Sequence, residues 1–283
     1  MFRRKAVLLG IAAIVIGMLF GLRLQAQCKN ADDYLYIFTS SSHTISGAVK
    51  NCGPDGFCRT TRIAPVADSS VSTFYDKDRP SNEISLDNVY QAVYGVRVYD
   101  LSNVDNSTSA FDCGGSYGHA DAHIGAGNLL QGLVTWASND NLFTCDYFDD
   151  RGVIHCSSAQ KISGLTINEV AVPVGNHQGG VSFPVSGNIK DPACTSGTET
   201  FNGSLTLQDS SVHGSGTGNL TVSLTGMYLS GQATCTTLGL VNLFTTQYDL
   251  RVSGHSDWAQ MDWEEAALKF KVRTLQFASE LDQ

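Results

Sequence analysis

The amino-acid sequence predicts an all-β protein, an antiparallel β-sandwich held together by disulfide bonds. Three observations lead to this prediction. Short strand-like runs separated by Gly, Asn or Asp recur along most of the chain, helical periodicity is absent before residue 257, and the chain contains eight cysteines. Serial strands without intervening helices argue against a fold of alternating helices and parallel strands.

The N-terminal residues are typical of an export signal. Met-Phe-Arg-Arg-Lys precedes an uncharged apolar run, residues 6–22, and the small residue Ala26 follows shortly after it. This pattern predicts a secretory signal peptide over residues 1–26. The apolar run is close to the length that spans a bilayer, so an uncleaved anchor helix is the alternative and would be the only membrane attachment. We therefore expect an exported protein: secreted, periplasmic or at the cell surface.

The eight cysteines all lie beyond the expected cleavage site. An even number of cysteines in an exported chain predicts disulfide bonds. Cys145 and Cys156 flank a turn sequence between two strand-like runs, and Cys194 and Cys235 lie in loops around a shared run of strands. Because no Cys-x-x-Cys motif occurs, metal binding by cysteine is the less favoured reading. The pairing of the other four cysteines stays open: Cys28, Cys52, Cys58 and Cys113.

The charge of the chain is informative about partners. The sequence has 27 acidic and 18 basic residues, and removal of residues 1–26 takes away four basic residues and no acid, which changes the formal charge from −9 to −13. An acidic surface is repelled by phosphate backbones, so we expect no nucleic-acid partner. A protein or glycan ligand is the expected partner.

The chain is expected to contain one main domain. Residues 27–80 are interpreted as a cysteine-containing β/loop segment packed on it, residues 81–256 as the sandwich, and residues 257–283 as a C-terminal helix. Within 218–230, apolar residues mark one face, and a slip near Gly226 predicts a β-bulge. From Asp257 the chain lacks Gly and Pro and begins with a variant of the capping box, which favours a helix. The alternative is a strand, because residues 268–273 alternate.

The segment YGHADAHIGAG, residues 117–127, contains the candidate metal site. On a strand, His119, Asp121 and His123 share one face, while Ala120, Ala122 and the other residues of opposite parity pack inward. Imidazole and carboxylate ligands suit Zn²⁺ or another divalent ion. Residues four apart on a strand are about 13 Å apart, so only two neighbours of the three could share an ion, together with ligands from elsewhere. The favoured reading is an exposed polar strand face without a cofactor.

Two further patterns point weakly to function. Residues 114–118 match Gly-x-Ser-x-Gly around Ser116, but that motif needs a strand before it and a helix after it. Aromatic residues could form a sugar-binding platform, although filling of the core is their default role; they are Tyr90, Tyr94, Tyr99, Trp136 and Tyr147.

Several strand sequences together resemble a known family. VYGVRVYDL, SYGHADAHIG, ISGLTINEVAVPV, LTVSLTGMYL and YDLRVSGHSD are similar to the exported bacterial β-sandwich proteins called choice-of-anchor proteins, over residues 92–256. The resemblance implies a secreted or surface β-sandwich and offers no catalytic residues. The expected function is a non-enzymatic binding role or a structural role in the cell envelope. The alternatives are an exported metal-dependent hydrolase that uses His119, Asp121 and His123, or a carbohydrate-binding module.

Overall fold

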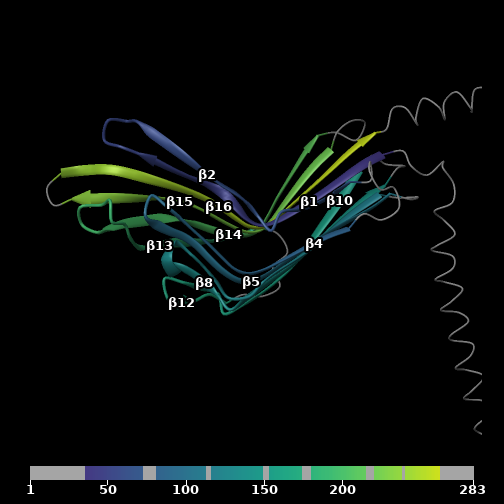
Figure 1. Cartoon of the computed structure of the whole chain (residues 1–283), viewed down its shortest axis with the longest axis horizontal. Coiled ribbons are helices and arrows are strands. Elements are labelled where there is room, and N and C mark those ends of the chain that lie inside the picture. Colours follow the sequence, from purple (N-terminus) through teal and green to yellow (C-terminus); the bar gives the residue numbers. More distant parts are fainter. Residues whose placement is uncertain are drawn as a thin grey trace, which may run out of the picture.

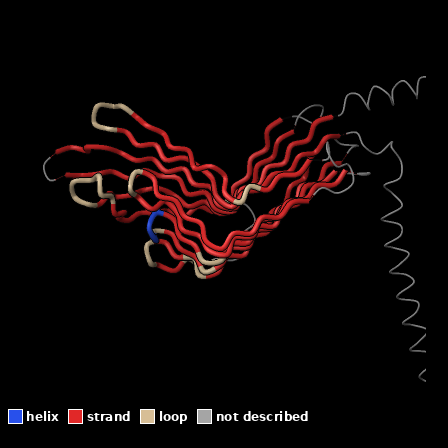
Figure 2. Tube along the Cα trace, in the orientation of Figure 1, coloured by secondary structure: helices blue, strands red, loops and turns tan. Residues whose placement is uncertain are grey.

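The structure is a computed structural model of the chain. It describes residues 36–72, 81–112, 116–148, 153–173, 180–214, 220–237 and 240–261, nearly all of them in β-strands (Figure 2). The expected signal segment over residues 1–26, Cys28 and Cys113 lie outside these ranges. The one helix within them is the short 3₁₀ turn η3 (Leu130–Gly132). No helix in the described ranges has the length and hydropathy needed to cross a membrane.

The first sheet has seven strands and joins the beginning of the described chain to its end. All its pairings are antiparallel, and β1 lies between β16 and β2 as an inner strand, with the short β3 beside β1 beyond the end of β2. Residues 36–72 therefore contribute directly to the main sheet. The strand order is β13 (Val181–Lys190), β14 (Thr198–Gly214), β15 (Leu220–Thr237), β16 (Leu240–Met261), β1 (Tyr36–Cys52) and β2 (Cys58–Val66), with β3 (Ser69–Ser72) paired to β1.

The second sheet has nine strands and is also antiparallel. Strands β4 and β5 form a hairpin closed by Tyr94 and Gly95, both with positive φ, as a two-residue type I′ turn requires. The strand order is β10 (Val153–Ser163), β9 (Ser138–Phe148), β6 (Ser116–Ile124), β5 (Val96–Asp112), β7 (Gly127–Leu129), β8 (Val134–Trp136), β11 (Thr166–Ile167) and β12 (Val170–Ala171), with β4 (Ser81–Val93) on the other side of β5.

The two sheets face each other as a sandwich (Figure 1). Strand β1 of the first sheet contacts β5 and β6 of the second, and alternate apolar residues of both sheets meet between them. The predicted apolar face of residues 218–230 is confirmed for Val222, Leu224, Met227 and Leu229, which are all buried. The largest cluster, here the apolar core, includes Ile45, Val49, Leu101, Val104, Leu129, Trp136, Phe201, Leu205, Leu229, Leu250 and Val252.

Both sheets bend at the same level, which divides the long strands into two arms (Figure 1). In the first sheet, Thr44, Ser253, Gly226 and Gln208 lie on adjacent strands, and strand pairing skips each of them and then resumes. Neighbouring strands each leave out one residue, so the register does not shift, and the β-bulge predicted near Gly226 is wrong in that respect. Ser253 and Gln208 both have a φ of 54°. We call this line of four residues the crease.

The interior at the crease is polar rather than apolar. Asn106, Asn139 and Asn141 reach across from the second sheet and are at most 1% exposed. The Ser42 hydroxyl donates to Asn106 Oδ1 at 2.8 Å, and Asn141 Nδ2 donates to the Ser253 hydroxyl at 3.0 Å. These buried hydrogen bonds link the two sheets. The polar layer comprises Ser42, Asn106, Asn139, Asn141, Gln160 and Ser253.

Strand β16 continues to Met261, and this corrects the prediction of a helix from Asp257. Backbone pairing joins residues 257–261 to β1, from Asp257 opposite Ser40 to Met261 opposite Tyr36, and Asp257 also pairs with Val222 of β15. A strand with a partner on each side satisfies its backbone groups in the sheet, and this outweighs local helix propensity. Residues 262–283 lie outside the described ranges.

Three disulfide bonds join described cysteines: Cys52–Cys58, Cys145–Cys156 and Cys194–Cys235. They include both pairs that the sequence singled out. The first two link paired positions of neighbouring strands, Cys52 opposite Cys58 and Cys145 opposite Cys156. Three disulfides are typical of a protein that lives in an oxidising compartment.

Candidate functional site

A row of polar side chains crosses the outer face of the seven-stranded sheet. Strand register places its six residues side by side on six consecutive strands, and all six are exposed. Inward-facing neighbours on the same strands, such as Val49, Phe201 and Tyr248, are buried. The row, here the amide row, is Ser186, Asn202, Gln232, Gln247, Lys50 and Thr60.

The middle of the amide row lies in an open hollow of about 520 Å³. Its lining includes Ala48, whose small side chain leaves room between the longer ones, and the backbone of Gly231. Glycine is required at position 231 by the packing on the inner face, because a Cβ atom would lie 2.4 Å from the Phe201 ring and 2.6 Å from the carbonyl oxygen of Asn202. The lining residues are Ala48, Lys50, Thr60, Asn202, Gly231, Gln232, Gln247, Tyr248 and Asp249.

The three amides of the row are free to bind a ligand. Within the described chain, no hydrogen bond engages the side chains of Asn202, Gln232 or Gln247. Asn188, one row away, differs in that its Oδ1 accepts a hydrogen bond from Thr200 at 3.2 Å. A primary amide has two N–H donors and a carbonyl acceptor, so the row presents alternating donors and acceptors to whatever lies in the hollow.

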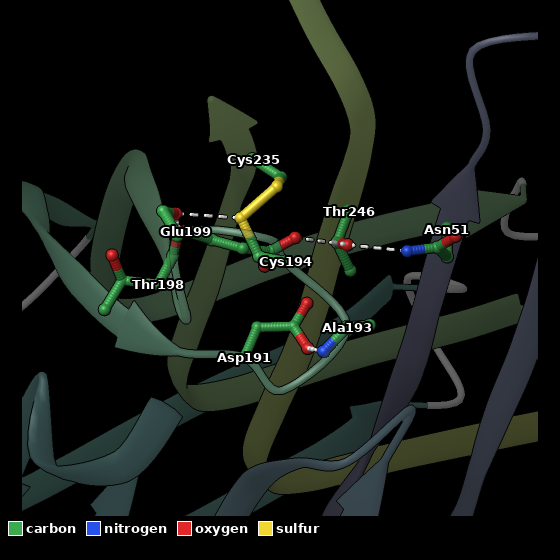
Figure 3. The surroundings of a disulfide bond; sticks show 9 residues. Asn51, Asp191, Ala193, Cys194, Thr198, Glu199, Cys235 and Thr246 are labelled. Carbon is green, nitrogen blue, oxygen red and sulfur yellow. Dashed lines mark hydrogen bonds between the residues drawn. A yellow bond between two sulfur atoms is a disulfide. The ribbon is translucent and has the colours of Figure 1, made fainter. Parts of the chain in front are cut away.

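A pair of buried acids lies on the inner side of the same sheet, beside a disulfide (Figure 3). Glu199 is 0% exposed and Asp191 is 2% exposed. The Thr246 hydroxyl donates to Glu199 Oε1 at 3.2 Å and accepts from Asn51 Nδ2 at 2.9 Å. Asp191 Oδ1 accepts from the backbone N–H of Ala193 at 2.8 Å, which fixes the start of the loop that follows β13.

Burial determines the protonation of this acid pair. Burial, and after it the nearby charge of Asp191, raise the pKa of Glu199 to about 7, and the hydrogen bond from Thr246 partly opposes this shift. Burial also raises the pKa of the Tyr248 hydroxyl, which faces Glu199. Tyr248 and Glu199 influence each other electrostatically without forming a well-aligned hydrogen bond. Glu199 therefore keeps its proton to near neutrality and stays close to Asp191 without full charge repulsion.

The Cys194–Cys235 disulfide covers this acid pair. Cys194 lies in the loop between β13 and β14, and its Sγ is 3.1 Å from the Ser196 hydroxyl. Cys235 is on β15 and is 0% exposed. The disulfide ties the loop to the sheet, and the acids below it are closed off from solvent. Buried acids that no substrate can reach fit a structural role rather than acid–base catalysis.

His119, Asp121 and His123 lie on β6, and the predicted division of its two faces is confirmed. Ala120, Ala122 and Ile124 are each 0% exposed, whereas the three polar residues point to the outer face of the nine-stranded sheet. The structure does not bring the three together around one point. Among the described residues, no group of three or more His, Cys, Asp or Glu is arranged to hold a metal ion.

His123 instead forms part of an exposed charge row. Asp105 on β5 and Asp140 on β9 lie opposite His123 on either side, and His123 Nδ1 contacts Asp140 Oδ1. His119 lies between Ser109 and Thr144, which offer no strong metal ligand. The arrangement is that of a solvated strand face with a cross-strand contact between His123 and Asp140. The divalent metal remains a prediction.

None of the other sequence candidates lines the hollow over the amide row. Ser116 begins β6, so a strand rather than a helix follows it, and the nucleophile-elbow geometry is absent there. Trp136 and Tyr99 are 3% exposed and belong to the apolar core, so neither can form a sugar platform. Tyr90 is exposed at 65%, but the Arg97 guanidinium covers its ring at 4.3 Å. The Tyr94 hydroxyl accepts a hydrogen bond from the Thr61 hydroxyl at 2.9 Å. The Tyr147 side chain lies outside the part of the chain that the structure describes.

The sequence analysis missed both the amide row and the buried acids. The row joins residues that are up to 197 positions apart in the chain, from Lys50 to Gln247, and only the strand register aligns them. Glu199 lies in a Ser-, Thr- and Gly-rich stretch that reads as a loop. One signal was available in the sequence. Cys194 lies three residues after Asp191, and a disulfide at Cys194 would anchor this loop and the acids near it to the sheet.

The chain was compared with protein-family models, with curated proteins and with solved structures, and none of them matches. The resemblance to choice-of-anchor proteins therefore stays a prediction.

Proposed function

We propose that the protein is an exported, non-enzymatic binding protein whose ligand occupies the hollow over the amide row. The single observation that supports this is the hollow itself: exposed, unengaged amides from Asn202, Gln232 and Gln247 converge on one concavity of the sheet. Concave sites with a few convergent polar groups are the usual places where ligands bind.

Two further features agree with this proposal. Three disulfides suit life outside the cytoplasm, where such a domain meets soluble or surface ligands. Of the two acid–base candidates described above, Glu199 is closed off from solvent and His123 is open to solvent on a strand face, and neither lines the hollow. A binding role uses the hollow without requiring any of these groups to react. The metal-dependent hydrolase has no comparable support from the geometry.

Chemical-shift mapping on the disulfide-bonded protein tests the proposal. The probes are neutral oligosaccharides, uronic-acid oligosaccharides and short peptides. We expect at least one class to shift the backbone signals of Lys50, Gln232 and Gln247 and to leave those of Asp121 unchanged. The variant Ala48→Trp, which fills the hollow without removing a polar group, is expected to abolish these shifts while its circular dichroism stays that of the wild type. Shifts confined to another surface, or no shifts with any class, contradict the proposal.

A further inference from the structure

We infer that the ligand of the hollow is a neutral oligosaccharide that lies across the strands, along the amide row from Thr60 towards Ser186. This inference rests on the proposed binding function and adds the chemical class and the direction of the ligand. It is drawn from four properties of the site: its hydrogen-bonding groups, its charge, its length and its boundaries.

The hydrogen-bonding groups of the row suit hydroxyls. Each sugar hydroxyl both donates and accepts, and the amides of Asn202, Gln232 and Gln247 can do the same from one side chain. The row ends in the hydroxyl residues Thr60 and Ser186, which continue the pattern. A peptide that binds by strand addition requires an open strand edge, and the four middle residues of the row lie on the inner strands β14, β15, β16 and β1, whose edges are already paired. Only the ends of the row, Ser186 and Thr60, lie on the edge strands β13 and β2.

The charge of the site favours a neutral ligand. Lys50 is the one charged residue of the six in the row, and Asp249, which also lines the hollow from the adjacent row, pairs with Arg251. The chain as a whole has a formal charge of −9. A polyanion such as a uronate chain or a nucleic acid would meet one cation and a repulsive background.

The boundaries of the site give the ligand its direction. Along β16, the outward residues beyond Gln247 are Asp249 and Arg251. Arg251 Nε is 3.5 Å from Asp249 Oδ1 and its guanidinium lies 4.8 Å from the Tyr228 ring, while the Tyr228 hydroxyl donates to Asp249 Oδ2 at 3.1 Å. These three side chains satisfy one another and form a wall. A ligand therefore meets a closed end along the strands and an open path across them, on which Lys50 is the one charged side chain.

The length of the row matches a short sugar chain. Six strands give five intervals, which is about 24 Å at the usual strand spacing. The repeat of an extended β-1,4-linked hexose chain is close to one strand spacing, so successive sugars would each meet the polar side chain of one strand. A chain laid across the sheet thus gains one set of hydrogen bonds per sugar until the row ends.

The first test is titration calorimetry with β-1,4-linked glucose and N-acetylglucosamine oligomers of increasing length. We expect affinity to rise by about tenfold from the disaccharide to the hexasaccharide and then to level off, because added sugars find no further strand. A neutral ligand also predicts an affinity that stays unchanged when the salt concentration is raised about tenfold. Affinity that does not depend on oligomer length, or that falls steeply with salt, overturns the inference.

The second test uses substitutions that keep side-chain shape. Asn202→Asp and Gln232→Glu replace the two N–H donors of each amide by an acceptor, and each is expected to weaken oligosaccharide binding by about 3- to 10-fold. The matched control is Asn88→Asp on β4, an exposed asparagine of the other sheet, which is expected to leave binding unchanged. Equal losses in the control and the row variants would contradict the inference.

The outcomes separate this inference from the proposed function. If uronate oligomers or peptides shift the signals of the hollow and neutral oligomers of either sugar do not, the ligand class is wrong and the binding function stands. If no probe of any class shifts those signals, both are wrong. If neutral oligomers bind at the hollow in the wild type and not in Ala48→Trp, both are supported.

Discussion

The apolar core and the polar layer at the crease are buried to the same extent but are held by different forces. Leu250 in the core and Asn139 in the polar layer are both 0% exposed. The core gains from removing apolar area from water, which is non-directional. The polar layer gains little from desolvation and instead depends on aligned hydrogen bonds between the sheets, such as that from Asn141 to Ser253.

The difference suggests what each region specifies. Apolar packing stabilises the sandwich but tolerates small shifts of one sheet over the other. The inter-sheet hydrogen bonds at the crease are satisfied in one alignment only, so they fix how the two bent sheets match. Substitutions in the two regions should therefore differ in how much they change the free energy of unfolding and in how strongly their effects depend on neighbouring substitutions.

The largest effect is expected for Phe201→Ala in the apolar core. Phe201 is 0% exposed, lies over Gly203 and Gly231 and packs edge-on against Tyr248 at 6.1 Å between ring centroids. Loss of the ring leaves a cavity, and the free energy of unfolding should fall by about 3–5 kcal/mol. Urea denaturation followed by circular dichroism measures it. Phe201→Leu is the control and should cost clearly less; a loss below about 1 kcal/mol for alanine would show that the core collapses around the site.

The next effect is the pH dependence caused by Glu199, an acid at the end of the apolar core. Its pKa is about 7 in the folded protein and 4.5 in the unfolded chain. Between these values the folded state holds a proton that the unfolded state has lost, so the free energy of unfolding falls as pH rises from 4.5 to 7, by up to roughly 3 kcal/mol. The stability that the neutral Glu199 retains relative to its charged form is therefore fully present below pH 4.5 and lost above pH 7.

Glu199→Gln should remove this slope, because the amide keeps the neutral shape at every pH. Urea midpoints measured across the window test it. The exposed Glu83 offers the control, and Glu83→Gln should retain the slope of the wild type. A slope that persists unchanged in Glu199→Gln would assign the pH dependence to other groups.

At the crease, Asn141→Ala should cost about 1–3 kcal/mol, less than the core substitution, because it removes a buried hydrogen bond and leaves Ser253 with a weaker partner. Asn141 also lies over Gly226, where a Cβ atom would be 2.5 Å from Asn141 Oδ1. Gly226→Ala should therefore be destabilising alone and nearly neutral in the Asn141→Ala background. A double-mutant cycle measures this coupling, and additive effects would contradict the close contact.

The sequence predicted the apolar region better than the crease, and the reason is physical. On β6, small apolar residues alternate with His119, Asp121 and His123, so the buried face follows from the pattern. On β9 the pattern fails, because Asn139 and Asn141 face inward while Leu142 is 41% exposed. Burial of these amides depends on Ser253, which is 112 residues from Asn141. Only the strand register of both sheets brings such distant partners together. The amide row is likewise aligned only by the strand register of the seven-stranded sheet.

The smallest effect is expected on the outer face of β6, where polar side chains are solvated. His123 and Asp140 are each 43% exposed, so their contact is screened by solvent, and His123→Ala should change the free energy of unfolding by less than about 0.5 kcal/mol. The contrast with Asn141→Ala isolates the effect of burial on a polar contact. The same variant also tests the metal alternative: if one zinc per chain bound the purified protein and were lost in His123→Ala, the face would be a metal site and the solvated reading would be wrong. Because His119 and Asp121 point outward at separate positions of the same strand, we expect no such stoichiometric zinc and an unchanged melting temperature when zinc is added.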